Sequence, residues 1–216
     1  MHGNGPIQAM KTILMLNWGL GLQILKSFHE RMDTDIVAVV TQYNPYSSDP
    51  WENCVHDYSA LHGYTTLNQD SISYDDLYAI IIDQKVDLLF SHAFMRKIPD
   101  FMVKATSHGA VNIHPSLLPL YRGPSPSYWV LKNKERITGL TSHYIDDGID
   151  TGDIIYQVEI PVNETDNFES LVDRLKGGVS ELINESMLRI NDRSFVPVRQ
   201  NHRQSTYAPK PSINRG

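Results

Sequence analysis

The sequence has little cysteine, no long hydrophobic run and no excess of positive charge. Its single cysteine, Cys54, excludes an internal disulfide and any zinc site built from several cysteines. No apolar stretch approaches the roughly 18 residues that cross a bilayer. The formal net charge of −6 argues against a nucleic-acid surface, which needs clustered lysine and arginine. We therefore expect a cytoplasmic protein that binds neither nucleic acid nor membrane.

The composition is that of an ordinary globular protein with one sizeable core. The chain has 216 residues, of which 41% are hydrophobic and 20% are charged. Residues 1–9 lack the basic and apolar regions of a signal peptide and are predicted to be a disordered leader. One folded domain is predicted over residues 10–210, followed by a tail at 211–216.

Strands and helices alternate along the first half of the chain. This alternation predicts an α/β fold: a Rossmann-like, mostly parallel twisted sheet with helices on both faces. Strands are expected at residues 12–16, 36–41, 64–67, 86–90 and 109–113, and helices after the glycine turn at 17–21, at 51–62 and at 73–84.

The second half predicts a different arrangement. Strands at 137–146 and 154–162 are expected to pair as an antiparallel hairpin. A helix is predicted to begin at 128–132. Residues 163–189 predict mostly one amphipathic helix, which Gly177 and Gly178 can bend.

The glycine turn at 17–21 is similar to a dinucleotide-binding fingerprint but lacks two of its features. The third glycine is missing, and no acidic residue ends the next strand, so NAD binding is not expected. Backbone N–H groups at the start of the following helix could still bind an anion.

Asn112 and His114 stand together where the strand at 109–113 is ended by Pro115. Alternation along a strand puts both side chains on one face, at the carboxyl end where open α/β sheets bind ligands. An amide that donates to an oxyanion and an imidazole that moves a proton suit acyl transfer. The pattern alone leaves a structural alternative open, in which Asn112 caps a turn and His114 is a satisfied, half-buried histidine.

A second segment, residues 144–153, adds an acidic, glycine-containing loop. Its Asp150 lies 36 positions after His114. Together the segments 111–123 and 144–153 resemble the folate-dependent formyltransferases. That group includes methionyl-tRNA formyltransferase, glycinamide ribonucleotide formyltransferase and the N-formyltransferases of nucleotide-linked sugars. The resemblance covers roughly residues 10 to 210, with the specific motifs between 94 and 157.

The resemblance implies a catalytic set of Asn112, His114 and Asp150 and a formyl donor, 10-formyltetrahydrofolate. The donor's pterin ring is expected at the main chain after the strand at 86–90, together with the acidic loop. The predicted donor-binding residues are Phe94, Met95, Arg96, Lys97, Ile98, Asp147, Gly148 and Ile149. The resemblance also implies a cis Leu118–Pro119 bond. No metal is expected, because the acidic loop lacks EF-hand spacing.

The amine acceptor is predicted to be a small molecule, a nucleotide-linked amino deoxysugar. Aromatic residues in the loop at 42–51 could stack on a base, although they could equally pack that loop onto the sheet. The predicted acceptor-binding residues are Trp18, Gly19, Tyr43, Tyr46, Trp51, Ser116, Arg122 and Gly123. Homodimer formation is also compatible with the sequence.

Other acceptors remain alternatives. The stretch at 204–210 resembles the end of the catalytic domain of methionyl-tRNA formyltransferase, where a basic tRNA-gripping domain follows; the sequence ends soon afterwards, so a tRNA acceptor is not expected. Gly19-Leu20-Gly21 replaces the Gly-Ser-Asn run that holds the phosphate of glycinamide ribonucleotide, which disfavours that acceptor. A hydrolase that releases formate from the same donor and a non-catalytic folate-binding protein are further alternatives.

Overall fold

The computed structural model describes residues 9–212, which fall into two compact units divided between Ala110 and Val111. The predicted leader at 1–9 lies outside the described residues except for Ala9, and the predicted tail at 211–216 lies outside them from residue 213 onward. The single domain over 10–210 stays a prediction. No helix of the described part is long and apolar enough to cross a membrane.

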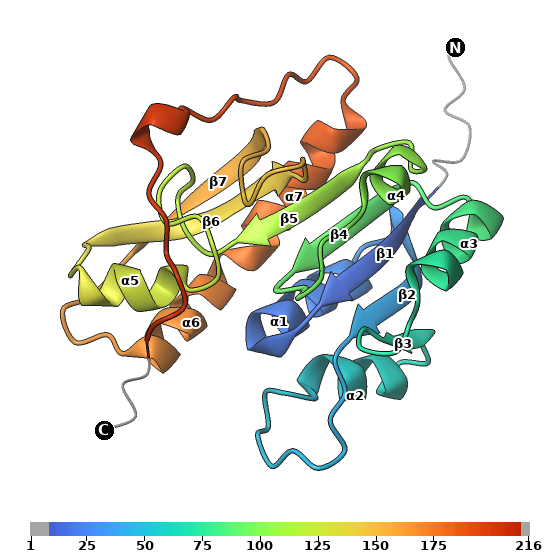
Figure 1. Ribbon diagram of the computed structural model, residues 1–216, viewed down its shortest axis with the longest axis horizontal. Coiled ribbons are helices and arrows are strands. Elements are labelled where there is room, and N and C mark those ends of the chain that lie inside the picture. Colours follow the sequence, from blue (N-terminus) through green and yellow to red (C-terminus); the bar gives the residue numbers. More distant parts are fainter. Residues whose placement is uncertain (1–8, 213–216) are drawn as a thin grey trace. The chain divides into compact units, whose positions relative to one another are not determined.

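The first unit contains a parallel sheet (Figure 1). Its strands follow the order β3-β2-β1-β4, and each neighbouring pair is parallel. They are β1 (Met10–Leu16), β2 (Thr34–Thr41), β3 (Thr66–Asn68) and β4 (Leu88–His92). Ile13 to Leu16 of β1 are fully buried, as expected for a central strand. The four strands predicted here are confirmed, with boundaries that differ by about two residues.

Helices connect these strands. They are α1 (Trp18–His29), α2 (Cys54–Leu61), α3 (Tyr74–Gln84) and α4 (Asp100–Lys104). Right-handed crossovers with this strand order place α1 and α2 on one face and α3 on the other. The helix α4 was not predicted, because five residues after Pro99 carry no helical periodicity.

The predicted glycine turn at 17–21 is wrong in one respect. Only Asn17 precedes the helix, and Gly19 to Gly21 form the first turn of α1. A Cβ atom at Gly21 would lie 3.3 Å from Cβ of Leu16, so glycine lets the first helical turn approach the end of β1.

The second unit contains an antiparallel sheet in which β6 pairs with both of its neighbours. The strands are β5 (Ala110–His114), which begins at the unit boundary, β6 (Ile137–Tyr144) and β7 (Ile154–Pro161). Asn112 faces His143 across β5 and β6, and Leu140 faces Val158 across β6 and β7. The predicted hairpin of β6 and β7 is therefore confirmed.

The helices of this unit are α5 (Pro126–Lys132), α6 (Phe168–Gly177) and α7 (Val179–Asn191), followed by a 3-10 turn, η1 (His202–Gln204). The prediction of mostly one helix over 163–189 is wrong. Asn167 accepts a hydrogen bond from the backbone N–H of Ser170 and starts α6 with a capping box. Gly178 lies between α6 and α7, where a Cβ atom would lie 3.0 Å from Cδ1 of Ile160 in β7.

Two loops and one extended segment complete the second unit. The loop at 115–125 follows β5 and contains the Leu118–Pro119 bond, which is cis as predicted. The loop at 145–153 joins β6 to β7. Residues 198–208, which we call the strap, run along the unit and are drawn in red in Figure 1. The strap forms an antiparallel bridge at Ile154 and Val198 and a parallel bridge at Arg122 and Tyr207.

Candidate active site

His114 ends β5 and is almost completely buried. Its Nε2 lies 2.7 Å from the backbone oxygen of Tyr121, and its Nδ1 lies 3.5 Å from Oδ2 of Asp150. Because a carbonyl oxygen only accepts, Nε2 carries the hydrogen, and the neutral ring has its lone pair on Nδ1. Burial lowers the pKa of His114, while Asp150 and the Tyr121 carbonyl act in the opposite direction. The ring is thus a base whose proton uptake occurs beside a carboxylate.

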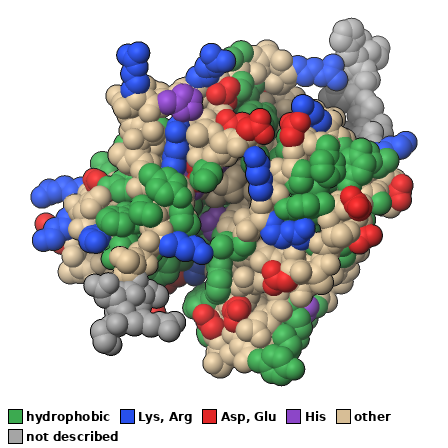
Figure 2. All heavy atoms as spheres, viewed as in Figure 1, with side chains coloured by type: hydrophobic (Ala, Val, Ile, Leu, Met, Phe, Trp, Pro, Cys, Tyr) green, Lys and Arg blue, Asp and Glu red, His purple; other side chains and the backbone are tan. Residues whose placement is uncertain are grey.

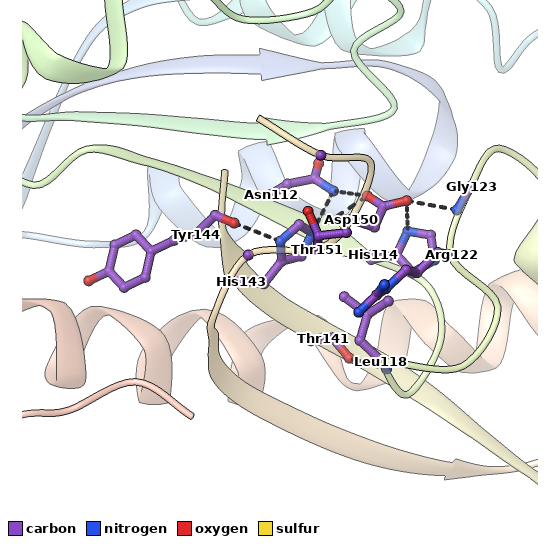
Figure 3. Close-up of polar contacts among 12 residues, drawn as sticks. Asn112, His114, Leu118, Arg122, Gly123, Thr141, His143, Tyr144, Asp150 and Thr151 are labelled. Carbon is purple, nitrogen blue, oxygen red and sulfur yellow. Dashed lines mark hydrogen bonds and ion pairs between the residues drawn. The ribbon is translucent and has the colours of Figure 1, made fainter. Parts of the chain in front are cut away.

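Asp150 lies in the loop at 145–153 with its carboxylate between Asn112 and His114 (Figure 3). Its Oδ2 accepts a hydrogen bond from the backbone N–H of Gly123 at 2.8 Å. Its Oδ1 lies 3.5 Å from Nδ2 of Asn112. Burial raises the pKa of Asp150, but the imidazoles of His114 and His143 and the Gly123 N–H outweigh burial and hold it well below its usual range. The carboxylate therefore stays charged at neutral pH.

The structure thus brings Asn112, His114 and Asp150 together. It also adds His143, which the sequence analysis did not select. Nε2 of His143 lies 3.2 Å from Nδ2 of Asn112 and 3.6 Å from Oδ1 of Asp150. Its Nδ1 lies 2.8 Å from the Tyr144 carbonyl, so Nδ1 donates and Nε2 accepts from the amide of Asn112. Only the register of β5 against β6 could have identified His143, and sequence does not give register.

Hydrogen bonds from a side chain of β6 fix the loop at 115–125. Thr141, opposite His114 in the sheet, donates to the carbonyl of Ser116 at 2.6 Å and accepts from the N–H of Leu118 at 3.1 Å. The hydroxyl of Ser116, a predicted acceptor-binding residue, is buried and donates to the Leu120 carbonyl at 2.6 Å. These bonds hold the residues after His114 in one path.

Arg122 and Gln200 form a second buried group beside Asp150. The Arg122 guanidinium donates to Oε1 of Gln200, from Nε at 3.1 Å and from Nη2 at 2.6 Å, and also to Nδ1 of His202. Nε2 of Gln200 donates to the carbonyls of Asp150 at 3.0 Å and Gly152 at 2.7 Å. Gln200 was not predicted, because a single glutamine in an extended tail carries no pattern. Arg122 was predicted to bind the acceptor; its side chain is engaged within the chain here.

Comparison with known proteins assigns the chain to a family. A family model described as formyl transferase matches residues 19–186. The chain belongs to the formyl transferase family. A methionyl-tRNA formyltransferase of Geobacillus sp. (strain WCH70) is 30% identical over 202 residues, covering 92% of this chain and 63% of that protein. The chain thus spans less than two thirds of the length of the Geobacillus protein.

Solved structures are similar over almost the whole chain. An N-formyltransferase from Helicobacter canadensis, in complex with folinic acid and dTDP-3-aminofucose, is 25% identical with a TM-score of 0.73, covering 95% of this chain and 72% of that one. A phosphoribosylglycinamide formyltransferase from Anaplasma phagocytophilum is 22% identical with a TM-score of 0.71, covering 93% and 98%. These similarities confirm the predicted fold class of this family member.

The predicted donor-binding residues lie on two loops, each described within its own unit. In the first unit, the side chain of Arg96 donates to the carbonyls of Gln69 and Ile72. Met95 is exposed there. In the second unit, the loop at 147–149 is also exposed, and Gly148 N–H donates to the Asp146 carboxylate. Their role in binding stays a prediction.

The predicted acceptor-binding residues of the first unit surround the start of α1 and the loop at 42–51. Trp18 is partly exposed and has a φ of 64°, whereas Gly19 is buried. Tyr43 stacks on His56 with ring centroids 4.1 Å apart. Tyr46 is 94% exposed, and Trp51 is 48% exposed. Residues 9–212 contain no group of three or more His, Cys, Asp or Glu side chains that could hold a metal.

Proposed function

We propose that this protein transfers a formyl group from 10-formyltetrahydrofolate to the primary amine of a nucleotide-linked amino deoxysugar. The observation that carries the proposal is the convergence of Asn112, His114 and Asp150 in a member of the formyl transferase family. The donor would be held by the main chain of residues 94–98 and by the loop at 147–149. Homodimer formation and a cytoplasmic location stay predictions.

The chemistry follows from the positions of the polar atoms. The amine nitrogen attacks the formyl carbon, and its proton passes to Nδ1 of His114, directly or through one water. The new imidazolium is stabilised by the Asp150 carboxylate, 3.5 Å away. One N–H of Asn112 faces Asp150 at 3.5 Å, longer than an ordinary hydrogen bond, and can donate to the oxyanion instead. The bond to the donor nitrogen then breaks, and that nitrogen takes the proton from His114.

Three observations favour a nucleotide-linked sugar. The Helicobacter canadensis protein, solved with dTDP-3-aminofucose, resembles this chain over 95% of its length. Tyr46 is 94% exposed, and its ring could stack on a base. The net charge is −6, and Figure 2 shows acidic and basic side chains interspersed on the visible face, which disfavours a large polyanion.

Methionyl-tRNA is the second candidate acceptor, because the Geobacillus relative carries that name and matches 92% of this chain. Glycinamide ribonucleotide is disfavoured by the Gly19-Leu20-Gly21 sequence at the start of α1. A hydrolase would use water in place of the amine on the same catalytic residues.

One assay separates these reactions. Purified protein is mixed with 10-formyltetrahydrofolate and, separately, with dTDP- and UDP-linked 3-amino and 4-amino deoxysugars, glycinamide ribonucleotide and methionyl-tRNA. Tetrahydrofolate formation gives the rate, and mass spectrometry detects the formylated product. We expect the highest kcat/KM with one of the amino sugars. A higher value with either other acceptor, or formate release without any amine, would overturn the choice of acceptor.

A further inference from the structure

Both groups that touch the His114 ring come from residues with left-handed backbone. Tyr121, whose carbonyl oxygen contacts Nε2, has a φ of 60°, and Asp150, whose carboxylate faces Nδ1, has a φ of 52°. Residues other than glycine adopt such angles only where their surroundings hold them there. The arrangement around His114 therefore requires support from outside the two loops.

The strap supplies this support at the Asp150 side through Gln200. The two amide hydrogens of Gln200 donate to the carbonyls of Asp150 and Gly152, on either side of Thr151. Its oxygen accepts both hydrogen bonds from Arg122, so every hydrogen-bonding position of this 6% exposed side chain is used. Two residues earlier, Val198 exchanges backbone hydrogen bonds of 2.8 Å with Ile154. The strap is thus fixed to the end of the loop that carries Asp150.

The other end of the strap holds Tyr121. The Tyr121 N–H donates to Oγ1 of Thr206 at 2.8 Å, and the Arg122 N–H donates to the carbonyl of Thr206 at 2.9 Å. The Ala208 N–H donates to the carbonyl of Arg122 at 2.6 Å. The same short segment therefore fixes Tyr121 and Asp150, whose oxygen atoms lie against the His114 ring nitrogens.

We propose that the strap positions Tyr121 and Asp150 around His114, with Gln200 as the main positioning residue and Thr206 as the second. The part that concerns turnover rests on the proposed function. Gln200 touches neither His114 nor the reacting atoms, and acts through the backbone on which the Asp150 carboxylate is carried.

The charged and titratable groups around His114 and Asp150 determine how a displacement of Asp150 or Tyr121 would change the pKa of His114. His114 faces Asp150 from the loop at 145–153, His143 from β6 and Arg122 from the loop at 115–125. Only Asp150 and the Tyr121 carbonyl favour the imidazolium; His143 and Arg122 oppose it. Loosening either strap contact should therefore lower the pKa of His114.

The experiment compares Gln200→Leu with Gln204→Leu. Gln204 lies between the two anchored ends, and its side chain makes no hydrogen bond to the described residues. The His114 ring is titrated by NMR with labelled histidine, and its signal is assigned from the His114→Gln spectrum. We expect a lower pKa of His114 and an approximately 100-fold lower kcat in Gln200→Leu, with KM for the donor within about twofold. Gln204→Leu should match the wild type in all three.

Two further variants keep the test decisive. Gln200→Glu retains the acceptor for Arg122 but loses both donors, so it should lower kcat as Gln200→Leu does; because of its added charge, the His114 titration is a readout for Gln200→Leu and not for Gln200→Glu. Thr206→Val keeps the side-chain shape and removes only the acceptor for Tyr121 N–H, so it should also lower the pKa of His114 if Gln200→Leu does not fold.

The outcomes separate positioning from general stability and from the proposed function. An unchanged His114 titration in folded Gln200→Leu and Thr206→Val, with only a lower Tm, would overturn the positioning role. A shifted titration with unchanged kcat would overturn its importance for turnover. If the wild type formylates none of the acceptors while the titration still shifts, the proposed function fails and the positioning role stands.

Discussion

Nδ1 of His114 lies 3.5 Å from Oδ2 of Asp150, and the same carboxylate oxygen accepts the Gly123 N–H at 2.8 Å. The carboxylate is therefore held in place by the loop that follows His114. Proton uptake by the ring and the charge of Asp150 are coupled, which makes both turnover and stability depend on pH in a defined direction.

Replacing the proposed base should affect turnover more than donor binding. In His114→Ala the proton acceptor is lost, and we expect kcat to fall on the order of 100-fold or more. Binding of the donor, measured by calorimetry with a non-transferable folate analogue, should change little. His108→Ala, in the first unit, is the matched control. Normal turnover in His114→Ala would contradict the proposed mechanism.

Asp150→Asn should move the pH profile. The amide can still accept the Gly123 N–H, but it removes the charge that raises the pKa of His114. The acidic limb of kcat/KM should therefore shift to lower pH, and kcat should fall on the order of 100-fold. Asp153→Asn, in the same loop, should keep the wild-type profile. A limb that stays in place in Asp150→Asn would show that the two groups are not coupled.

Stability should decrease as the pH falls from about 7.5 to 5.5, around the ordinary histidine pKa. The folded pKa of His114 is lowered, chiefly by burial, so the unfolded chain binds more protons in this window and stability rises with pH. Urea unfolding of His114→Gln should show a smaller slope of the free energy of unfolding against pH than that of the wild type. The contribution of His114 makes stability rise with pH throughout this range.

Asp150 adds a second loss of stability at more acidic pH. Its folded pKa is depressed, so its contribution is complete above the ordinary aspartate pKa of about 3.9 and is lost as the pH falls below it. Asp150→Asn should remove this component from unfolding curves between about pH 4 and pH 2.5. Identical curves for the two proteins would contradict the assignment.

Two glycines should respond in opposite directions to alanine. A Cβ atom at Gly139 in β6 would lie 2.1 Å from the carbonyl oxygen of Val158, so Gly139→Ala should lower the free energy of unfolding by roughly 1–3 kcal/mol. Nothing lies within 4 Å of a Cβ atom at Gly177 in α6, and Gly177→Ala should raise it by about 0.5–1 kcal/mol. Equal effects of both changes in urea unfolding would refute this packing.

Tyr46 tests the nucleotide part of the proposal. If its ring stacks on the base, Tyr46→Ala should raise KM for the amino-sugar nucleotide about fivefold or more, since stacking contributes about 1–3 kcal/mol. Because the side chain is 94% exposed, Tm should not change. Leu61→Ala, an exposed residue of α2, is the control. An unaltered KM would remove Tyr46 from the acceptor site.

The strands and the meeting of Asn112 with Asp150 were predicted on different grounds: the strands from residue patterns and the meeting from family resemblance. Burial on both faces gives β1 and β4 continuous apolar runs, which are visible without a structure. The convergence of Asn112, His114 and Asp150 was implied by family resemblance, since alternation alone relates only residues of one strand. His143 depends on strand register and Gln200 on the path of an extended segment, and neither leaves a local pattern.

The predicted helix boundaries were wrong where local packing and glycine positions matter more than periodicity. The pattern over 163–189 continues through Gly178, but α6 ends at Gly177 and α7 begins at Val179. The start of α1 was placed too late because glycines usually mark turns, whereas Gly21 here permits close packing against Leu16.

The strap makes most of its contacts at its two ends; residues 201–204 between them are exposed, and His202 among them accepts a hydrogen bond from Arg122. Arg203 offers a trypsin-like protease a cleavage site in this stretch. A single cut there would disconnect Gln200 from Thr206, but Leu140, Ile155 and Leu182 would still pack the sheet and α7 together. A single proteolytic cut would therefore abolish turnover while the protein remains folded.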